Sequence, residues 1–429
     1  MLDMAYIREN GELLQRTADG KGIALSVAEL IERDDRRRGL LREVERLRGE
    51  RNRLSELVGR LLKQGATEEA EPARKEAQTT NDELGVLEAE LVEVEASCRK
   101  LMQLVPNPVS ADTPEGKSDA DNVEVKRVGE LPSFEFEPLS HVELGEKLGI
   151  VDLPRGVKIG GARQYVLKGM GWHLHRAVQQ LAMDVLESRG FTLLDVPLMV
   201  RGEALLNTGF FPTGEDQVFS IAEEDRYLVG TSEVSLVSYL AGEIVELDGP
   251  IRLAAATACF RREIGSSGRD VHGLYRVHQF SKVEQVVVCE NDPELSERLL
   301  QEITDNAERI LQLLELPYRI VAVCIGDMSQ KTHKQYDIET WMPSRQAYGE
   351  THSASNLLDF QARRANIRYR DEAGKLRYCH TLNNTAIATP RILIPLLENH
   401  QREDGSVYVP QALRPYLGGR EELRADIWG

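Results

Sequence analysis

Residues 260–285 read FRREIGSSGRDVHGLYRVHQFSKVEQ, two segments of strand character around a loop rich in glycine and serine. The loop is long for a simple hairpin, and loops of that kind often serve ligands. Because successive side chains of a strand point to opposite faces, Arg261 and Glu263 are predicted to share one face. The second segment is predicted to carry on one face Arg276, His278, Phe280, Lys282 and Glu284. A solvated antiparallel sheet would also have a charged face, but an arginine that forks to phosphate beside an aromatic ring suits a nucleotide.

The segments around this stretch follow one another in an order typical of an α+β fold. Strand character is predicted at 191–199, 226–230, 252–260, 276–289, 318–325 and 335–342. Apolar residues at helical spacing predict helices at 172–189, 231–242, 293–314, 355–366 and 388–400. Since the strands come in succession and do not alternate strictly with helices, we expect a mainly antiparallel sheet with flanking helices. No Gly-x-Gly-x-x-Gly motif follows a strand, so the dinucleotide fingerprint is missing.

Three further short motifs offer side chains for substrate binding. Gly230-Thr231-Ser232-Glu233 stands at a strand-to-helix junction, where it forms either an ordinary helix cap or a small polar pocket for an ammonium group and a hydroxyl. Glu350-Thr351-His352-Ser353 offers the oxygen ligands that Mg²⁺ prefers. In NNTAIATPR, residues 383–391, a helix is predicted to open near Ala388, which places Arg391 near a helix N-terminus, where anions bind well. Pro395 predicts a kink or a late start in that helix.

Residues 1–105 are predicted to form an N-terminal domain with a long helical hairpin at 31–102. Apolar residues recur there in steps of four and three, which predicts an antiparallel coiled coil. The predicted seam consists of Leu40, Val44, Leu47, Leu54, Val58 and Leu61 against Leu84, Leu87, Leu91, Val94, Cys98 and Leu101. A stretch rich in proline, aspartate and small residues, 106–125, is predicted to be a linker to a second domain at 126–429.

The two helices of the hairpin differ in charge. Residues 31–64 hold eleven Lys and Arg against seven Asp and Glu, whereas residues 68–100 hold four against ten. Two solvated faces that attract each other explain this pattern, and so does an Arg-rich helix that contacts phosphate. The whole chain carries a formal charge of −17 and only 6% aromatic residues, which argues against wholesale coating of nucleic acid.

The composition also indicates the cellular compartment of the protein and whether it binds zinc. The five cysteines form no CxxC pair, as expected for reduced thiols in a cytoplasmic chain. No apolar run is long enough to span a membrane, and no signal peptide is recognised. No zinc site is expected, because the one close histidine pair, His173 and His175, is spaced i and i+2 on a predicted helix.

Taken together and in this order, the hairpin and the four motifs resemble seryl-tRNA synthetase, a class II aminoacyl-tRNA synthetase. The resemblance covers essentially the whole chain, to the closing VPQALRPY at 409–416. The segment from 172 to 197 is similar to class II motif 1, 260–285 to motif 2 and 383–401 to motif 3. The resemblance implies a coiled-coil tRNA-binding arm followed by a class II catalytic domain built on a mainly antiparallel sheet.

The resemblance also implies a role for each motif residue. The L-serine site would contain Thr231, Ser232, Glu233, Glu284, Asn383 and Thr385. The ATP site would contain Arg261, Arg262, Glu263, Val277, Phe280, Glu350, Thr351, His352, Ser353 and Arg391. Arg261 would fork the α-phosphate, Glu263 would meet the adenine edge and Arg391 would hold the γ-phosphate, and these three are the expected catalytic residues. Glu350 and Ser353 would hold Mg²⁺ that enters with ATP.

The activity implied is ATP-dependent formation of seryl-adenylate and transfer of serine to the 3′ end of tRNA-Ser, by a cytoplasmic homodimer. The residues expected to touch tRNA are Arg36, Arg37, Arg38, Arg42, Arg46 and Arg53. Three alternatives remain: a serine-adenylating enzyme that loads a non-tRNA acceptor, an inactive relative that only binds, and a duplicate synthetase tied to antibiotic resistance or biosynthesis.

Overall fold

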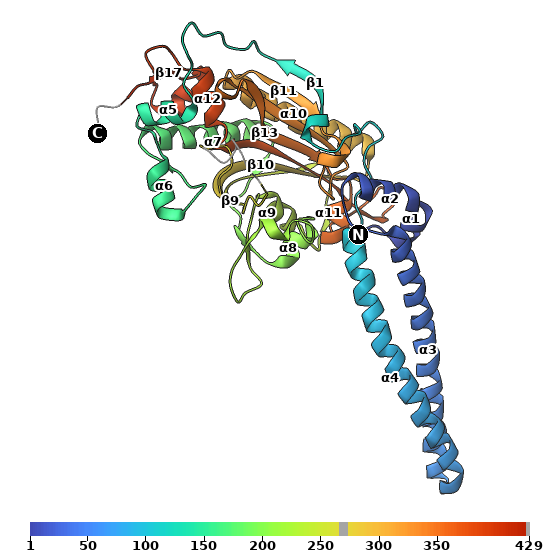
Figure 1. The fold of residues 1–429 in the computed structure, drawn as a ribbon. Coiled ribbons are helices and arrows are strands. Elements are labelled where there is room, and N and C mark those ends of the chain that lie inside the picture. Colours follow the sequence, from blue (N-terminus) through green and yellow to red (C-terminus); the bar gives the residue numbers. More distant parts are fainter. Residues whose placement is uncertain (266–272, 426–429) are drawn as a thin grey trace. The chain divides into compact units, whose positions relative to one another are not determined.

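The computed structural model describes residues 1–265 and 273–425. The chain forms two compact units, Met1–Pro106 and Asn107–Gly429 (Figure 1). Most of the glycine- and serine-rich loop predicted after Glu263 falls at 266–272 and lies outside the described residues. Among the helices that are described, none is long and apolar enough to cross a membrane.

The first unit is helical, and its core confirms most of the predicted seam. Its helices are α1 (Met4–Glu9), α2 (Gly11–Gly20), α3 (Val27–Lys63) and α4 (Thr67–Leu104). The side chain of Ser26 caps α3, and Gly65 takes a left-handed φ of +75° in the turn before α4. The residues of the seam that are buried against one another are Leu40, Val44, Leu47, Leu84, Leu91, Val94 and Cys98. This apolar stripe holds the two antiparallel helices together.

The second unit is built on a sheet that has eight strands within the described residues. In spatial order they are β1 (Val123–Val128), β11 (Tyr318–Ala322), β12 (Lys334–Met342), β13 (Ala347–Asn356), β16 (His380–Thr389), β10 (Gln279–Cys289), β9 (Ile251–Phe260) and β4 (Thr192–Leu193). Neighbours pair antiparallel except β4, which runs parallel to β9. The predicted α+β class with a mainly antiparallel sheet is therefore confirmed.

Helices cover the sheet on both faces. On one face the core includes side chains from α5 (His141–Lys147), α7 (Met170–Ser188), α10 (Pro293–Leu313) and α12 (Leu393–Asn399). On the other face α9 (Glu233–Ser238) and α11 (Phe360–Ala365) contribute to a smaller cluster. The residues of β10 divide between them, because Val283 and Val287 join the first core and Val286 and Val288 the second.

Shorter elements complete this unit. The small sheets are β2 (Val151–Asp152) with β3 (Val166–Leu167), β5 (Met199–Val200) with β7 (Tyr227–Leu228) and β6 (Phe219–Ser220), β8 (Ile244–Val245) with β14 (Arg368–Arg370) and β15 (Leu376–Tyr378), and β17 (Val407–Tyr408) with β18 (Glu422–Leu423). The remaining α-helices are α6 (Leu153–Gly160) and α8 (Gly202–Asn207).

Residues 107–122, most of the predicted linker 106–125, belong to the second compact unit. The side-chain amide of Asn107 donates to the carbonyl oxygens of Lys331 and Leu357 at 3.0 and 2.8 Å. β1 then continues the same segment into the main sheet. Proline and small polar residues correctly indicate irregular backbone, but hydrogen bonds fix that backbone to the second unit.

The sequence interpretation also misses several strands, among them β1 at the edge of the main sheet and two strands in its middle, β13 and β16. Their asparagines and alanines are weak strand formers, and burial in the middle of the sheet decides their conformation. The helix predicted to open near Ala388 begins only at Leu393, the late start that Pro395 predicts. β10 begins at Gln279, so the predicted strand at 276–289 is shorter at its start.

Candidate functional site

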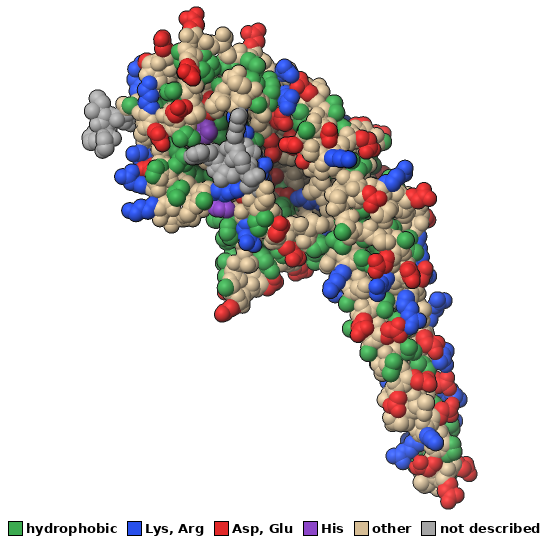
Figure 2. All heavy atoms as spheres, viewed as in Figure 1, with side chains coloured by type: hydrophobic (Ala, Val, Ile, Leu, Met, Phe, Trp, Pro, Cys, Tyr) green, Lys and Arg blue, Asp and Glu red, His purple; other side chains and the backbone are tan. Residues whose placement is uncertain are grey.

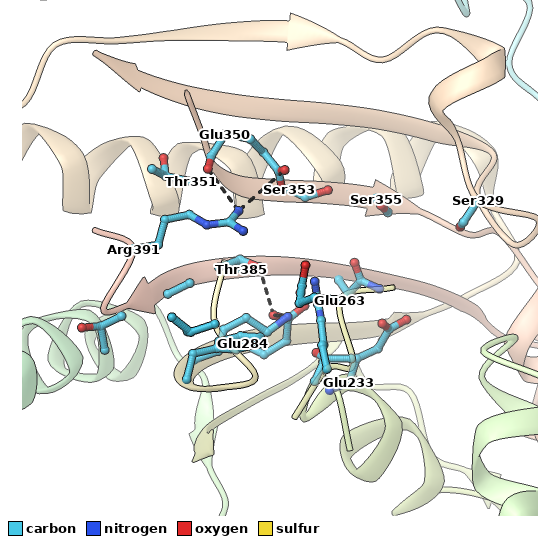
Figure 3. A pocket seen from close by; sticks show the side chains of 18 of the residues that line it. Glu233, Glu263, Glu284, Ser329, Glu350, Thr351, Ser353, Ser355, Thr385 and Arg391 are labelled. Carbon is cyan, nitrogen blue, oxygen red and sulfur yellow. Dashed lines mark hydrogen bonds and ion pairs between the residues drawn. The ribbon is translucent and has the colours of Figure 1, made fainter. Parts of the chain in front are cut away.

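A pocket opens on the face of the main sheet that α9 and α11 leave partly uncovered (Figure 3). On β10, α9 and α11 pack near Val286 and Val288, while Phe280, Lys282 and Glu284 line the pocket. The predicted site residues that the structure brings together in its lining are Thr231, Glu233, Arg261, Glu263, Val277, Phe280, Glu284, Glu350, Thr351, Ser353, Asn383, Thr385 and Arg391. Four sequence motifs thus converge on one cavity.

Two β-bulges aim side chains into this pocket. In β13, Glu350 pairs with Glu339 and His352 pairs with Ile338, so Thr351 is an extra residue in that strand. Glu350 and Ser353 would lie on opposite faces of a regular strand, and the bulge lets both line the pocket. In β16, Ala386 is the extra residue between Thr385 and Ile387.

One end of the pocket contains two carboxylates, each paired with a lysine. The Lys331 ammonium lies 2.6 and 2.8 Å from the two carboxylate oxygens of Glu233, and Gln361 donates to the same carboxylate at 2.7 Å. The Lys282 ammonium lies 2.6 Å from Glu284, to which the Thr385 hydroxyl also donates. Both carboxylates are at most 4% exposed. Such a set of acceptors and donors suits a small zwitterion with a polar side chain.

Burial and charge act in opposite directions on the Glu284 carboxyl. Burial raises its pKa, the Lys282 ammonium and the Thr385 hydroxyl lower it, and the Glu233 charge raises it again. The net shift is upward from the ordinary value. An additional cation at this carboxylate would favour its ionised form, which is the charge state that a substrate ammonium group requires.

Two arginines and an aromatic ring also line the pocket, and Arg391 lies at the end away from Glu233 (Figure 3). The Arg391 guanidinium donates to the Tyr275 and Glu350 carbonyl oxygens at 3.0 and 3.2 Å and lies 3.7 Å from the Glu350 carboxylate (Figure 3). The Arg261 guanidinium donates to the Gly230 carbonyl oxygen and lies 5.3 Å from the centroid of the Phe280 ring. Two arginines with an aromatic ring between strands suit the phosphates and base of a nucleotide.

A further carboxylate, Asp337, lies on β12 opposite Ser353 of β13. It accepts a hydrogen bond from Gln335 at 2.9 Å, and burial, followed by the Glu350 charge, raises its pKa well above the usual range. Within 1–265 and 273–425 no three His, Cys, Asp or Glu side chains are grouped as metal ligands. The Glu350 carboxylate and the Ser353 hydroxyl both line the pocket and are the kind of oxygen groups that hard cations prefer.

Three of the predicted site residues lie outside the pocket lining. Ser232 is buried, with its hydroxyl directed to the Ala255 carbonyl oxygen at 3.5 Å. His352 is buried beside the Thr351 hydroxyl at 2.8 Å, and burial lowers its pKa to about 3, so it stays uncharged at neutral pH. The side chain of Arg262 is exposed.

Arg276 and His278, which the strand pattern places on the pocket face, also lie outside the lining. Arg276 pairs with Glu263 at 3.3 Å, and the His278 ring lies 2.9 Å from the Arg261 carbonyl oxygen. Both therefore contact the residues that follow β9 and do not reach the cavity. The reason is that the strand begins at Gln279, so period-two alternation does not extend back to them.

The sequence interpretation missed several lining residues on the chain before and within β12. They are Ser329, Lys331, Thr332 and Gln335, together with Phe210 and Ser355. Lys331 stands in irregular chain where no motif or periodicity points to it. Only the fold places it opposite Glu233, because the two residues are far apart in sequence.

In the first unit, the arginines predicted to touch tRNA lie on exposed helix surface and most are paired with acids. Figure 2 shows basic and acidic side chains intermingled along the hairpin. Arg36 pairs with Glu90 across the two helices, Arg46 with Glu43 and Arg53 with Glu50. Arg37 pairs with Asp34, and Arg42 donates to the Arg38 carbonyl oxygen. The excess of positive charge on α3 is thus partly neutralised within the hairpin.

Each of the two units contains a region that matches a known protein family. Residues 1–109 match the family of seryl-tRNA synthetase N-terminal domains, and residues 218–400 match the class II tRNA synthetase core domain of the G, H, P, S and T enzymes. The serine–tRNA ligase of Deinococcus radiodurans is 47% identical over 429 residues, which is 100% of both chains. That of Rubrobacter xylanophilus is 44% identical over 97% of this chain and 98% of the relative.

Solved structures show the same likeness. The seryl-tRNA synthetase of Pyrococcus horikoshii, solved in complex with ATP, is 37% identical with a TM-score of 0.89 over 99% of this chain and 100% of that one. The cytoplasmic serine–tRNA ligase of Naegleria fowleri, in complex with AMP, is 27% identical with a TM-score of 0.84 over 99% of each chain.

Proposed function

This chain belongs to the seryl-tRNA synthetase family, and from that premise we propose that its pocket activates L-serine with ATP and then transfers the serine to tRNA-Ser. In the first step the serine carboxylate attacks the α-phosphate of ATP, which gives seryl-adenylate and pyrophosphate. In the second, the terminal ribose hydroxyl of the tRNA attacks the acyl group and AMP leaves. The observation that carries this proposal is a single cavity lined by two carboxylate–lysine pairs, two arginines and an aromatic ring.

The chain's own residues do this work by position and charge. Serine lies among Thr231, Glu233, Glu284 and Thr385, with Asn383 beside its hydroxyl. A substrate without that hydroxyl leaves buried polar groups unpaired, which can reject it by orders of magnitude. Arg261 and Arg391 stabilise the phosphate charges that shift as the bond to the α-phosphate forms, and Phe280 stacks on adenine. None of these residues needs to form a covalent bond to the substrate. Holding the two reactants in the right orientation supplies much of the rate acceleration.

We also propose that Mg²⁺ enters with ATP and is held by Glu350 and Ser353. The carboxylate and the hydroxyl line the same wall, brought together by the bulge at Thr351. When bound, the ion neutralises phosphate charge and orients the pyrophosphate leaving group. We expect no zinc, and we place the reaction in the cytoplasm.

The reaction is tested by ATP–pyrophosphate exchange with each of the twenty amino acids. Exchange that depends on serine alone supports the proposal, whereas exchange with another amino acid overturns the substrate. Charging of tRNA-Ser separates this function from the alternative of a serine-adenylating enzyme with a non-tRNA acceptor. The match of residues 1–109 to the synthetase N-terminal domain favours tRNA as the acceptor.

The active form is expected to be a homodimer that pairs through the motif 1 region, α7 and the strand after it. Leu181 of α7 is 5% exposed and belongs to the chain's own core, so it contributes nothing to such an interface. The surface that remains includes Trp172, which is 54% exposed, and a groove where α7 meets Leu194 and Tyr416. A symmetric partner would cover this surface. Light scattering that gives a monomer with full activity at micromolar concentration would contradict this expectation.

A further inference from the structure

Lys331 is the least expected residue of the amino-acid end of the pocket. Its side chain is largely buried, and its ammonium group contacts both carboxylate oxygens of Glu233 at 2.6 and 2.8 Å. The same ammonium lies 4.2 Å from the centroid of the Phe210 ring, an arrangement that favours a desolvated cation. Glu233 lies at the same end of the pocket as Glu284 (Figure 3), and its charge acts on the Glu284 carboxyl.

The partners of Lys331 and Glu233 are themselves fixed. The Gln361 amide donates to Glu233 and to the Thr208 carbonyl oxygen, and its own oxygen accepts from the Thr381 hydroxyl at 2.8 Å. The Lys331 backbone is held through its carbonyl oxygen, which accepts from Asn107 at 3.0 Å. Ordered partners on both sides mean that the Lys331–Glu233 pair exists before substrate enters, so little reorganisation is needed on binding.

The two carboxylates therefore offer different things to a substrate. Two donor groups, the Lys331 ammonium and the Gln361 amide, already make three contacts to Glu233, and a carboxylate has room for about four hydrogen bonds. Glu233 thus retains about one acceptor position, inside a pair without net charge. At Glu284, the Lys282 ammonium and the Thr385 hydroxyl both approach the same oxygen, Oε2. Both carboxylates are paired with a lysine, but these two contacts at Glu284 leave its other oxygen, Oε1, to an incoming ammonium group, whereas Glu233 suits a single neutral donor such as a hydroxyl.

We propose that Lys331 is a positioning and specificity-determining residue of this pocket: it neutralises and orients Glu233, so that the pocket accepts one ammonium group and one neutral hydroxyl. This inference rests on the proposed function, since it concerns how the same pocket selects L-serine. Without the Lys331 charge, two carboxylates would face one remaining lysine. The pocket would then tolerate a second amino group in place of the hydroxyl.

The test measures serine-dependent pyrophosphate exchange in the full-length chain with Lys331→Met, which keeps the length of the side chain and removes its charge. The KM for serine is expected to rise about tenfold or more, because a buried carboxylate loses its partner, while the KM for ATP stays within about twofold. Lys331→Arg should restore most of the affinity. Selectivity should shift toward L-2,3-diaminopropionate, which carries an amino group where serine carries its hydroxyl.

Two further variants keep the test sharp. If Lys331 acts through Glu233, the double variant Lys331→Met with Glu233→Gln should lose less than the product of the two single effects. Lys126→Met is the matched control, since Lys126 pairs with the buried Glu308 at 2.7 Å away from the pocket, and it should leave the KM for serine unchanged.

The outcomes separate the two proposals. Wild-type chain without serine-dependent exchange counts against the proposed function. If the wild type is active, any of three results overturns the role of Lys331. The first is a double variant whose effect on the KM for serine equals the product of the two single effects. The others are equal rises in the KM for ATP and for serine, or a KM for serine in Lys331→Arg as high as in Lys331→Met. If Lys331→Met does not fold, Lys331→Gln takes its place as the uncharged variant in each of these comparisons.

Discussion

Arg391→Ala is expected to lower the rate of serine-dependent pyrophosphate exchange by about 10²–10³-fold, the loss typical when one preorganised charge contact is removed. Arg391 is held at the phosphate end by the Tyr275 and Glu350 carbonyl oxygens, so its guanidinium is oriented before ATP binds. The KM for ATP should rise more than the KM for serine. Glu284→Ala should show the reverse, because its carboxylate lies at the amino-acid end.

Initial rates at varied ATP and varied serine measure this contrast. Arg402→Ala is a suitable control, because Arg402 pairs with Glu422 at 2.7 Å outside the pocket lining. Equal losses for both substrates in both variants would show that the two ends of the pocket are wrongly assigned.

Removal of the hairpin is expected to abolish most tRNA charging and to leave seryl-adenylate formation intact. The cut is placed before Asn107, because Asn107 anchors the backbone of Lys331 and belongs to the second compact unit. A chain that begins at Asn107 should therefore retain pyrophosphate exchange within a few-fold. Discrimination between tRNA-Ser and other tRNAs should disappear together with charging.

The two assays on one protein make this result interpretable. Retained pyrophosphate exchange shows that the catalytic unit is folded, so a loss of charging then belongs to the hairpin. In the full-length chain, affinity for tRNA-Ser should fall steeply with salt, because arginine contacts to phosphate release counterions. Unimpaired charging of tRNA-Ser by the shortened chain would assign the hairpin another purpose.

Periodicity and motif spacing predicted much of this molecule. The seam from Leu40 to Cys98 follows from apolar spacing alone, because a helix repeats within a few residues. The motif residues were found because their chemistry is local: an arginine beside a glutamate, or a proline before an arginine. These short-range signals are also the ones that point to an α+β chain.

Features that depend on tertiary pairing escaped prediction. The bulges at Thr351 and Ala386 are visible only in the register with the neighbouring strands, and they decide which side chains face the substrate. Lys331 meets Glu233 across 98 residues of sequence, so no local pattern could join them. The same holds for Asn107, whose two hydrogen bonds reach residues more than 200 positions away.

The ion pairs along the hairpin make its own carboxylates competitors for its arginines. A phosphate that approaches Arg36 or Arg46 must displace Glu90 or Glu43. The free energy gained is then the difference between two ion pairs at an exposed surface, where water screens both and each contributes little. A contact between one arginine and one phosphate therefore contributes almost no binding free energy. Only a nucleic acid whose backbone contacts many arginines at once binds with appreciable affinity. The ion pairs of the hairpin therefore disfavour nonspecific binding of other polyanions.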